Sequence, residues 1–119
     1  MDEQQKGIRA KLLGAELKRE KIDLPGIGEG WVRELTAGEQ DEIEEGRRKA
    51  AQEGAKPFHM RAFLASVALC DADGVPLFGE KDREMLGRVS AATLSRITEV
   101  ALRLSGYGSE SPEEDARKN

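Results

Sequence analysis

An acidic loop near the middle of the chain holds the residue types best suited to bind a metal ion. Asp71, Asp73 and Glu80 surround Gly74. Aligning this glycine with the invariant glycine of a calcium-binding EF-hand loop places the three acids at the third, fifth and twelfth ligand positions. The first ligand position is then Leu69, which offers no side-chain oxygen. Without that first carboxylate, we do not expect the loop to hold calcium.

The same loop is better interpreted as a turn. In the Asp-Ala-Asp-Gly sequence at 71–74, the aspartates can hydrogen-bond the local backbone and Gly74 can adopt a left-handed conformation. Pro76 follows and would interrupt the short strand that a calcium loop contains. We therefore predict a turn without a metal.

The other residues that could carry chemistry lack companions. His59 is the only histidine and Cys70 the only cysteine, so no histidine pair or internal disulfide can form. Glu42 and Glu45 could act as a pair of carboxylates, but no apolar residues surround them, which favours a solvated helix face. The Gly-x-Gly-x-Gly run at 26–30 joins two expected strands, whereas a phosphate cradle needs a strand that leads into a helix. We predict no catalytic, metal or cofactor site, and no enzyme activity.

The composition indicates one small soluble domain. The chain has 119 residues, of which 35% are charged and 38% hydrophobic, enough for a modest core. Its net charge of −4 argues against a nucleic-acid binder, and the one basic run, 47–49, follows five acids. No apolar run approaches the roughly 20 residues of a membrane span. The charged N-terminus lacks a signal-peptide core, so we predict a cytoplasmic protein with no membrane partner.

The hydrophobic pattern predicts an α+β fold. We expect a predominantly helical small domain with a short β-hairpin at about 21–35 and three to four helices. Residues 1–20 are expected to form an N-terminal helical segment, residues 21–106 a single globular domain, and residues 107–119 a flexible acidic tail. Two short alternating runs on either side of the glycine-rich loop indicate the hairpin.

Capping signals and periodicity place the first two helices. Spaced apolar residues predict a helix from Gly7 to about Glu20. Thr36 and Glu39 form a capping box, in which each side chain accepts a hydrogen bond from the backbone amide of the other residue. The charged helix that this box begins is expected to end near Glu53.

The apolar segment 58–78 is the expected centre of the core. Its residues 60–70 fit a helix of about eleven residues, although alternating apolar positions leave a strand open. A helical pattern begins again near Glu80, Ser90 is a candidate cap for a second segment, and Ser105–Gly106 ends it. That last helix has the most strongly amphipathic pattern in the chain.

Two apolar stripes on the terminal helices are candidate contact surfaces for a partner protein. They consist of Leu12, Leu13 and Leu17 on the N-terminal helix, and of Leu94, Ile97, Ala101 and Leu104 on the C-terminal helix. The alternative is that both stripes belong to the core, and we favour that alternative for the C-terminal helix.

Several short motifs follow one another in a recognisable order. They are Trp31 to Glu39 before a charged helix, Arg61-x-x-Leu64 in an apolar segment, Asp71 to Phe78, Leu104-Ser-Gly106, and an acidic tail that ends in Lys118-Asn119. In their order and spacing, over roughly residues 22–119, they resemble the tail assembly chaperones of long-tailed (siphovirus-type) bacteriophages and prophages.

The resemblance implies a non-catalytic protein that needs no cofactor. Such a chaperone binds the tape measure protein and helps recruit tail tube protein subunits during tail morphogenesis. It acts in the host bacterial cytoplasm and is not expected in the mature virion. Self-association and a longer frameshifted product are left open. The alternative function is a structural phage tail component, such as a completion or connector protein.

Overall fold

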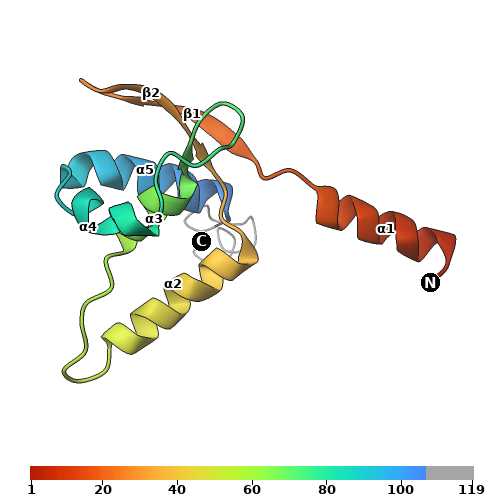
Figure 1. Cartoon of the computed structure of the whole chain (residues 1–119), viewed down its shortest axis with the longest axis horizontal. Coiled ribbons are helices and arrows are strands. Elements are labelled where there is room, and N and C mark those ends of the chain that lie inside the picture. Colours follow the sequence, from red (N-terminus) through yellow and green to blue (C-terminus); the bar gives the residue numbers. More distant parts are fainter. Residues whose placement is uncertain (107–119) are drawn as a thin grey trace, which may run out of the picture.

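A buried helix, α3 (Met60–Ala68), lies at the centre of the computed structural model, which describes residues 1–106 (Figure 1). Its buried residues occupy nearly every side of the helix: Ala62, Phe63, Leu64, Ala65, Ser66 and Ala68. A helix that is apolar on most sides is stable only when several other elements cover it. Helices α4 (Arg83–Leu86) and α5 (Ala91–Leu104) pack against it, and its chain continues directly into strand β3 (Leu69–Cys70).

The sheet has three antiparallel strands in the order β1 (Arg19–Leu24), β2 (Gly28–Arg33) and β3. Strands β1 and β2 form the predicted hairpin. Its turn is of type II, since Pro25 precedes Gly26 at φ +79° and the Ile27 amide donates to the Leu24 carbonyl at 2.9 Å. The buried side chains of the hairpin, Ile22, Leu24 and Val32, join the core.

The loop after β3 is the predicted turn. One carboxylate oxygen of Asp71 accepts hydrogen bonds from the amides of Asp73 and Val75, at 2.9 and 3.0 Å. Gly74 has φ +85°, and its amide donates to the Asp71 carbonyl. Pro76 pairs with Cys70 beyond the turn, so the returning chain covers the outer edge of β3.

Helix α5 contacts both the central helix α3 and the sheet. Its buried residues follow the i, i+3, i+4, i+7 spacing of one helical face: Leu94, Ile97, Thr98 and Ala101. This face packs on α3 and on strands β1 and β2. Two arginines extend from α5 to the hairpin: Arg96 Nε donates to the Asp23 carbonyl at 2.8 Å, and Arg103 pairs with Glu20.

The stretch before α5 is divided into short pieces. The 3-10 turn η1 (Glu80–Asp82) leads into α4, and residues 87–90 separate α4 from α5. Arg83 attaches α4 to α3, because its guanidinium lies 4.6 Å from the centre of the Phe63 ring and donates to Ser66 Oγ at 2.9 Å. Ser90 occupies the N-cap position of α5, as predicted, but its side chain makes no capping hydrogen bond.

Helix α2 (Ala37–Ala50) projects from the core and is mostly solvated. The predicted capping box of Thr36 and Glu39 is confirmed at its start, and the helix ends slightly before the predicted Glu53. Ile43 is its one buried residue. Near its C-terminal end, Gly46 lies so close to the Phe58 ring that a β-carbon there would be 2.5 Å from a ring atom.

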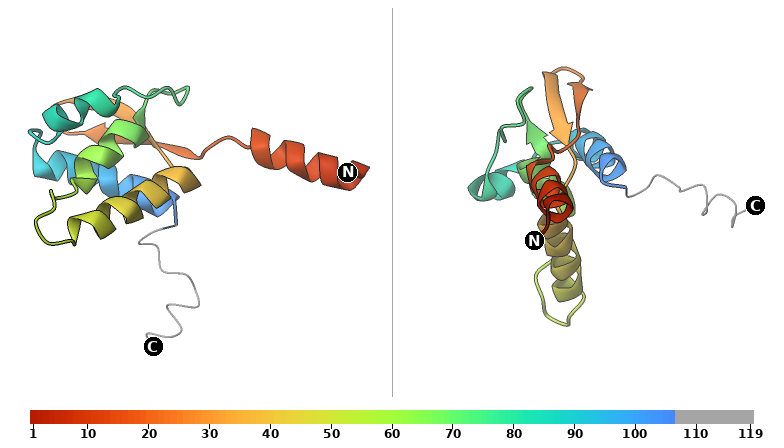
Figure 2. Two further views of the ribbon diagram at one scale, coloured as in Figure 1. Left: turned by 60° about the horizontal axis from the view of Figure 1, so that its bottom comes forward. Right: turned by 90° about the vertical axis from the view of Figure 1, so that its right-hand side faces the viewer.

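Helix α1 (Glu3–Gly14) lies apart from the domain (Figures 1 and 2) and buries none of its residues. The helix predicted for residues 7–20 starts earlier and ends earlier than expected, so the predicted range is wrong at both ends. The helix starts earlier because Asp2 and Gln5 form a capping box. It ends at Gly14, and Ala15 has extended backbone angles. Leu17 consequently lies in the linker to β1, outside the helix.

The predicted α+β fold class is confirmed: residues 1–106 form five α-helices, a 3-10 turn and one small sheet. The segment 60–70 was predicted as a helix, with a strand left open. It is a helix up to Ala68 and a strand over its last two residues, so each interpretation is confirmed in part. The division into residues 1–20 and 21–106 stays a prediction, and the expected acidic tail, 107–119, lies outside the described residues.

The contact between Gly46 and Phe58 predicts that Gly46→Ala destabilises the protein. The new methyl group would overlap the ring of Phe58, which itself packs on Phe63 at a centroid distance of 5.6 Å. Overpacking of this kind costs about 1–3 kcal/mol of unfolding free energy, which chemical denaturation would measure. The matched control is Gly38→Ala on the same helix, where a β-carbon has its nearest neighbour at 3.9 Å. The control should be neutral or stabilising, and equal loss in both variants would contradict the contact.

Candidate interaction surfaces

The acidic loop is folded as a turn. Within residues 1–106, no group of three or more histidine, cysteine, aspartate or glutamate side chains lies close enough to hold an ion. One oxygen of the Asp71 carboxylate accepts hydrogen bonds from the amides of Asp73 and Val75 within the turn. No helix in this part of the chain is long and apolar enough to span a membrane.

His59 and Cys70 lie in different surroundings. His59 is exposed at the start of α3 and makes no capping hydrogen bond with its side chain. Cys70 is buried, and burial raises the pKa of its thiol even though Arg33 and Arg19 act in the opposite direction. A protonated, buried thiol is a poor nucleophile and serves as a small hydrophobic residue.

The predicted contact residues on the C-terminal helix lie mainly in the core. Leu94, Ile97 and Ala101 are at most 4% exposed, and Leu104 is half-buried. They face α3 and the sheet, where they belong to the hydrophobic core. Ile97 and Ala101 are therefore core residues, in line with the alternative, and Leu94 is a core residue that also contributes to the wall of a surface groove.

The predicted contact residues near the N-terminus have different surroundings. Leu12 and Leu13 on α1 are 74% and 71% exposed, and Ile8 on the same helix is 60% exposed. Leu17 is half-buried in the linker, beside Arg19 at the start of β1. The helix thus presents large aliphatic side chains to solvent on an arm outside the core.

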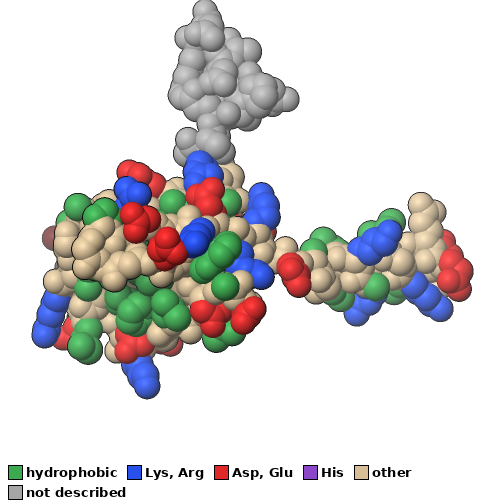
Figure 3. Space-filling model, turned by 90° about the horizontal axis from the view of Figure 1, so that it is seen from above, with side chains coloured by type: hydrophobic (Ala, Val, Ile, Leu, Met, Phe, Trp, Pro, Cys, Tyr) green, Lys and Arg blue, Asp and Glu red, His purple; other side chains and the backbone are tan. Residues whose placement is uncertain are grey.

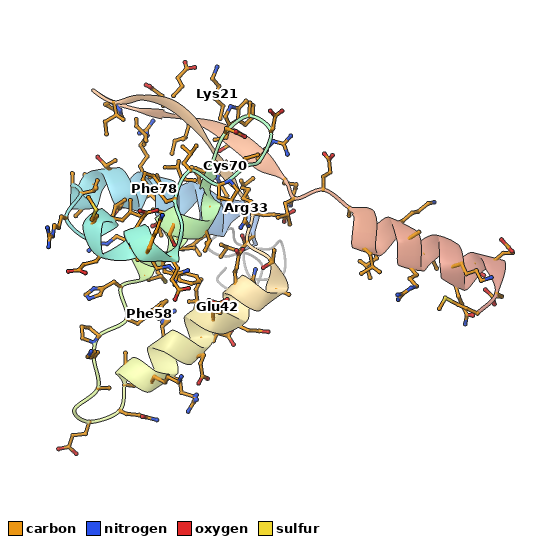
Figure 4. All side chains as sticks on the ribbon, viewed as in Figure 1. Lys21, Arg33, Glu42, Phe58, Cys70 and Phe78 are labelled. Carbon is orange, nitrogen blue, oxygen red and sulfur yellow. The ribbon has the colours of Figure 1, made fainter. Side chains whose placement is uncertain are left out.

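The loop from Val75 to Phe78 forms a further apolar surface that the sequence did not predict. Val75 and Leu77 are more than half exposed, although this segment was expected to lead back into the core. Phe78, labelled in Figure 4, ends this loop and is 36% exposed. Figure 3, a view from above, shows hydrophobic side chains gathered on the domain between charged ones. Pro76, which lies between Val75 and Leu77, pairs with Cys70 of β3.

A groove of about 470 Å³ lies on another part of the domain. Its lining comes from three segments, namely residues 58–62, the connection between α4 and α5, and the first half of α5. Phe58, labelled beside α2 in Figure 4, is one of the lining residues. No local pattern in the sequence indicated this groove, because its walls come from segments that are distant from one another along the chain.

A largely buried ion pair connects β2 to α2. Arg33 donates to both carboxylate oxygens of Glu39, at 2.9 and 2.7 Å, and the two side chains are 12% and 16% exposed. Burial alone would raise the pKa of Glu39, but the hydrogen bonds from Arg33 and Thr36 outweigh it and lower that pKa. The bond to Glu39 raises the pKa of Arg33. This pair ties the start of α2 to β2, and both side chains make further bonds, Arg33 to the Glu34 carbonyl and Glu39 to the Thr36 amide.

The comparisons with known proteins point to one fold. No protein-family model matches the sequence, and no curated protein matches it. The solved structure of the bacteriophage HK97 tail assembly chaperone is similar to this one, with a TM-score of 0.60 and 20% sequence identity. The similarity covers 82% of this chain and 96% of that one. This chain has the fold of a phage tail assembly chaperone.

The resemblance predicted from the order of motifs is thus confirmed at the level of the fold. Because the similarity extends over nearly all of the HK97 chaperone chain, it concerns the arrangement of the whole domain. A shared helix pair or hairpin alone would cover a smaller part of either chain.

The ion pair of Arg33 and Glu39 predicts a loss of stability in Glu39→Gln. The neutral amide leaves Arg33 without its charged partner, which should cost about 2 kcal/mol of unfolding free energy at neutral pH. The folded-state pKa of Glu39 is below the ordinary value of about 4.5. The stabilisation is therefore complete above that value and lost as the pH falls through the folded-state pKa. Denaturation at neutral and acidic pH should show the difference from the wild type shrinking in acid.

A matched control is Glu45→Gln, which removes the exposed pair with Arg48 on the same helix. Solvent screens such a pair, so this variant should unfold like the wild type. A difference between Glu39→Gln and the wild type that did not change with pH would contradict the electrostatic explanation.

Proposed function

We propose that this protein is a phage tail assembly chaperone that binds the tape measure protein and helps recruit tail tube subunits during tail morphogenesis. The observation that carries the proposal is the fold shared with the HK97 tail assembly chaperone over 96% of that chain. In this proposal the protein acts in the host bacterial cytoplasm and is absent from the mature virion.

The exposed apolar surface of the chain supports a binding role. Ile8 and Leu12 lie one helical turn apart on α1, next to the equally exposed Leu13. An apolar stripe on a helix can pack against the matching stripe of another helix. The surrounding charges, 35% of all residues, keep such a complex in solution. These properties suit a protein that shields a long helical partner from aggregation.

The proposal predicts that co-expression keeps the tape measure protein soluble. The protein encoded beside this chain that has the length and helical pattern of a tape measure would be produced with and without it, and the soluble fraction compared. We expect a higher soluble fraction and co-purification of the two proteins. Unchanged solubility together with no complex would contradict the proposal, as would recovery of this chain from purified phage particles.

The contribution of α1 can be measured in the same assay. The double variant Leu12→Asp/Leu13→Asp changes exposed residues only, so circular dichroism should show an intact fold. It should recover less of the tape measure protein than the control variant Gln4→Asp, which changes an exposed polar position of the same helix. Equal recovery would exclude α1 from the contact.

A further inference from the structure

The groove of about 470 Å³ beside α3 and α5 has a mixed lining that includes one unusual polar atom. Its large or buried apolar residues are Phe58, Met60, Ala62, Val89 and Leu94. A volume of this size is within the range of protein sites that bind large organic groups. Val89, at 39% exposed, marks the rim, and Ala62 and Leu94, at 4% each, form the floor.

The unusual atom is the hydroxyl of Thr98, which lines the groove. Thr98 is 8% exposed, and its Oγ1 has no hydrogen-bond partner among the residues that the structure describes. A helical threonine can usually satisfy its hydroxyl on a carbonyl of the preceding turn. A buried hydroxyl without a partner destabilises the fold, and valine would fill the same space without this penalty. The polar atom is therefore suited to a group that enters the groove from outside.

The charge at the rim indicates which kind of group this is. Arg61 is exposed, and within residues 1–106 its one side-chain hydrogen bond goes to Ser95 Oγ, at 3.3 Å. It forms no ion pair in this part of the chain, and the other ionisable residue in the lining is His59. The rim is thus complementary to an acidic group.

This charge disfavours the chain's own N-terminal arm as the occupant. Helix α1 carries three basic residues, Lys6, Arg9 and Lys11, against one acid, Glu3. Like charges at the rim would repel it. The lining also contains no strand, so the groove offers no sheet edge to which an extended peptide could add.

We propose that this groove is the docking site for an amphipathic helix of the partner protein, which inserts a bulky apolar side chain beside Thr98 and places an acidic side chain against Arg61. A polar atom of the partner helix completes the hydrogen bonding of the Thr98 hydroxyl. The inference rests on the proposed function, since the partner in question is the tape measure protein, and it specifies the chemistry of the segment that is bound.

The test uses two neighbouring alanines in the first turn of α5. Ala91 lines the groove, whereas Ala92 faces a different side of the helix, and both are exposed. Ala91→Trp fills the groove without altering the core, and Ala92→Trp is the matched control. In pull-down titrations with the full-length tape measure protein, Ala91→Trp should weaken binding at least tenfold and Ala92→Trp should bind like the wild type.

Two further variants test the polar contacts separately. Arg61→Glu should weaken binding of a synthetic helix with leucines on one face and glutamates beside them, and improve binding of the same helix with lysines. Thr98→Val should raise the midpoint of thermal unfolding while weakening binding to the tape measure protein. A structural role for Thr98 would not produce these opposite effects, so unchanged binding by Thr98→Val would overturn its assignment.

The outcomes separate the two proposals. If the wild type fails to bind the tape measure protein, the proposed function is wrong. If the wild type binds and Ala91→Trp binds equally well, the function stands and the groove is not the docking site. If synthetic peptides of residues 1–16 or 107–119 bind the groove, and Ala91→Trp abolishes this binding, the occupant is this chain itself and the inference is overturned.

Discussion

Burial of α3 is the constraint on which the rest of the structure depends. A nine-residue helix with six buried positions cannot exist in water without cover on several sides. That cover comes from α5 along one side, from α4 through the contact of Arg83 with Phe63, and from the sheet that α3 itself enters through β3. The apolar face of α5 is used for this purpose. Surfaces available to a partner must therefore lie elsewhere, on α1, on the loop after β3, and at the exposed end of the groove.

Local signals in the sequence predicted much of this arrangement. The Thr36 and Glu39 capping box, the Asp71 turn and the single face of α5 each depend on residues a few positions apart, and all three are present. The predicted start of α1 is wrong because the helix begins at the Asp2 and Gln5 capping box, in a polar segment without apolar periodicity. The prediction of no metal or catalytic site rested on the missing companions of His59, Cys70 and Asp71, and it stays a prediction.

Features formed by distant segments could not be predicted in this way. A two-residue strand such as β3 carries no periodicity of its own and is specified by pairing with β2. The groove combines residues near 60, 88 and 94. The lack of a hydrogen-bond partner for the Thr98 hydroxyl depends on how these segments pack, which no local pattern shows. The order of motifs nevertheless pointed to the right fold, since turns and caps with a defined spacing fix where successive helices and strands begin.

The central claim is that the core built on α3 is complete without α1, which leaves the arm available for a partner. Hydrogen exchange followed by NMR on the free, dilute protein tests this claim directly. Amides of α3, β2 and α5 should exchange only through global unfolding. Amides of α1 should exchange close to the unprotected rate, because a short helix that buries none of its residues is only marginally stable in water. Protection of α1 equal to that of α3 would contradict the account.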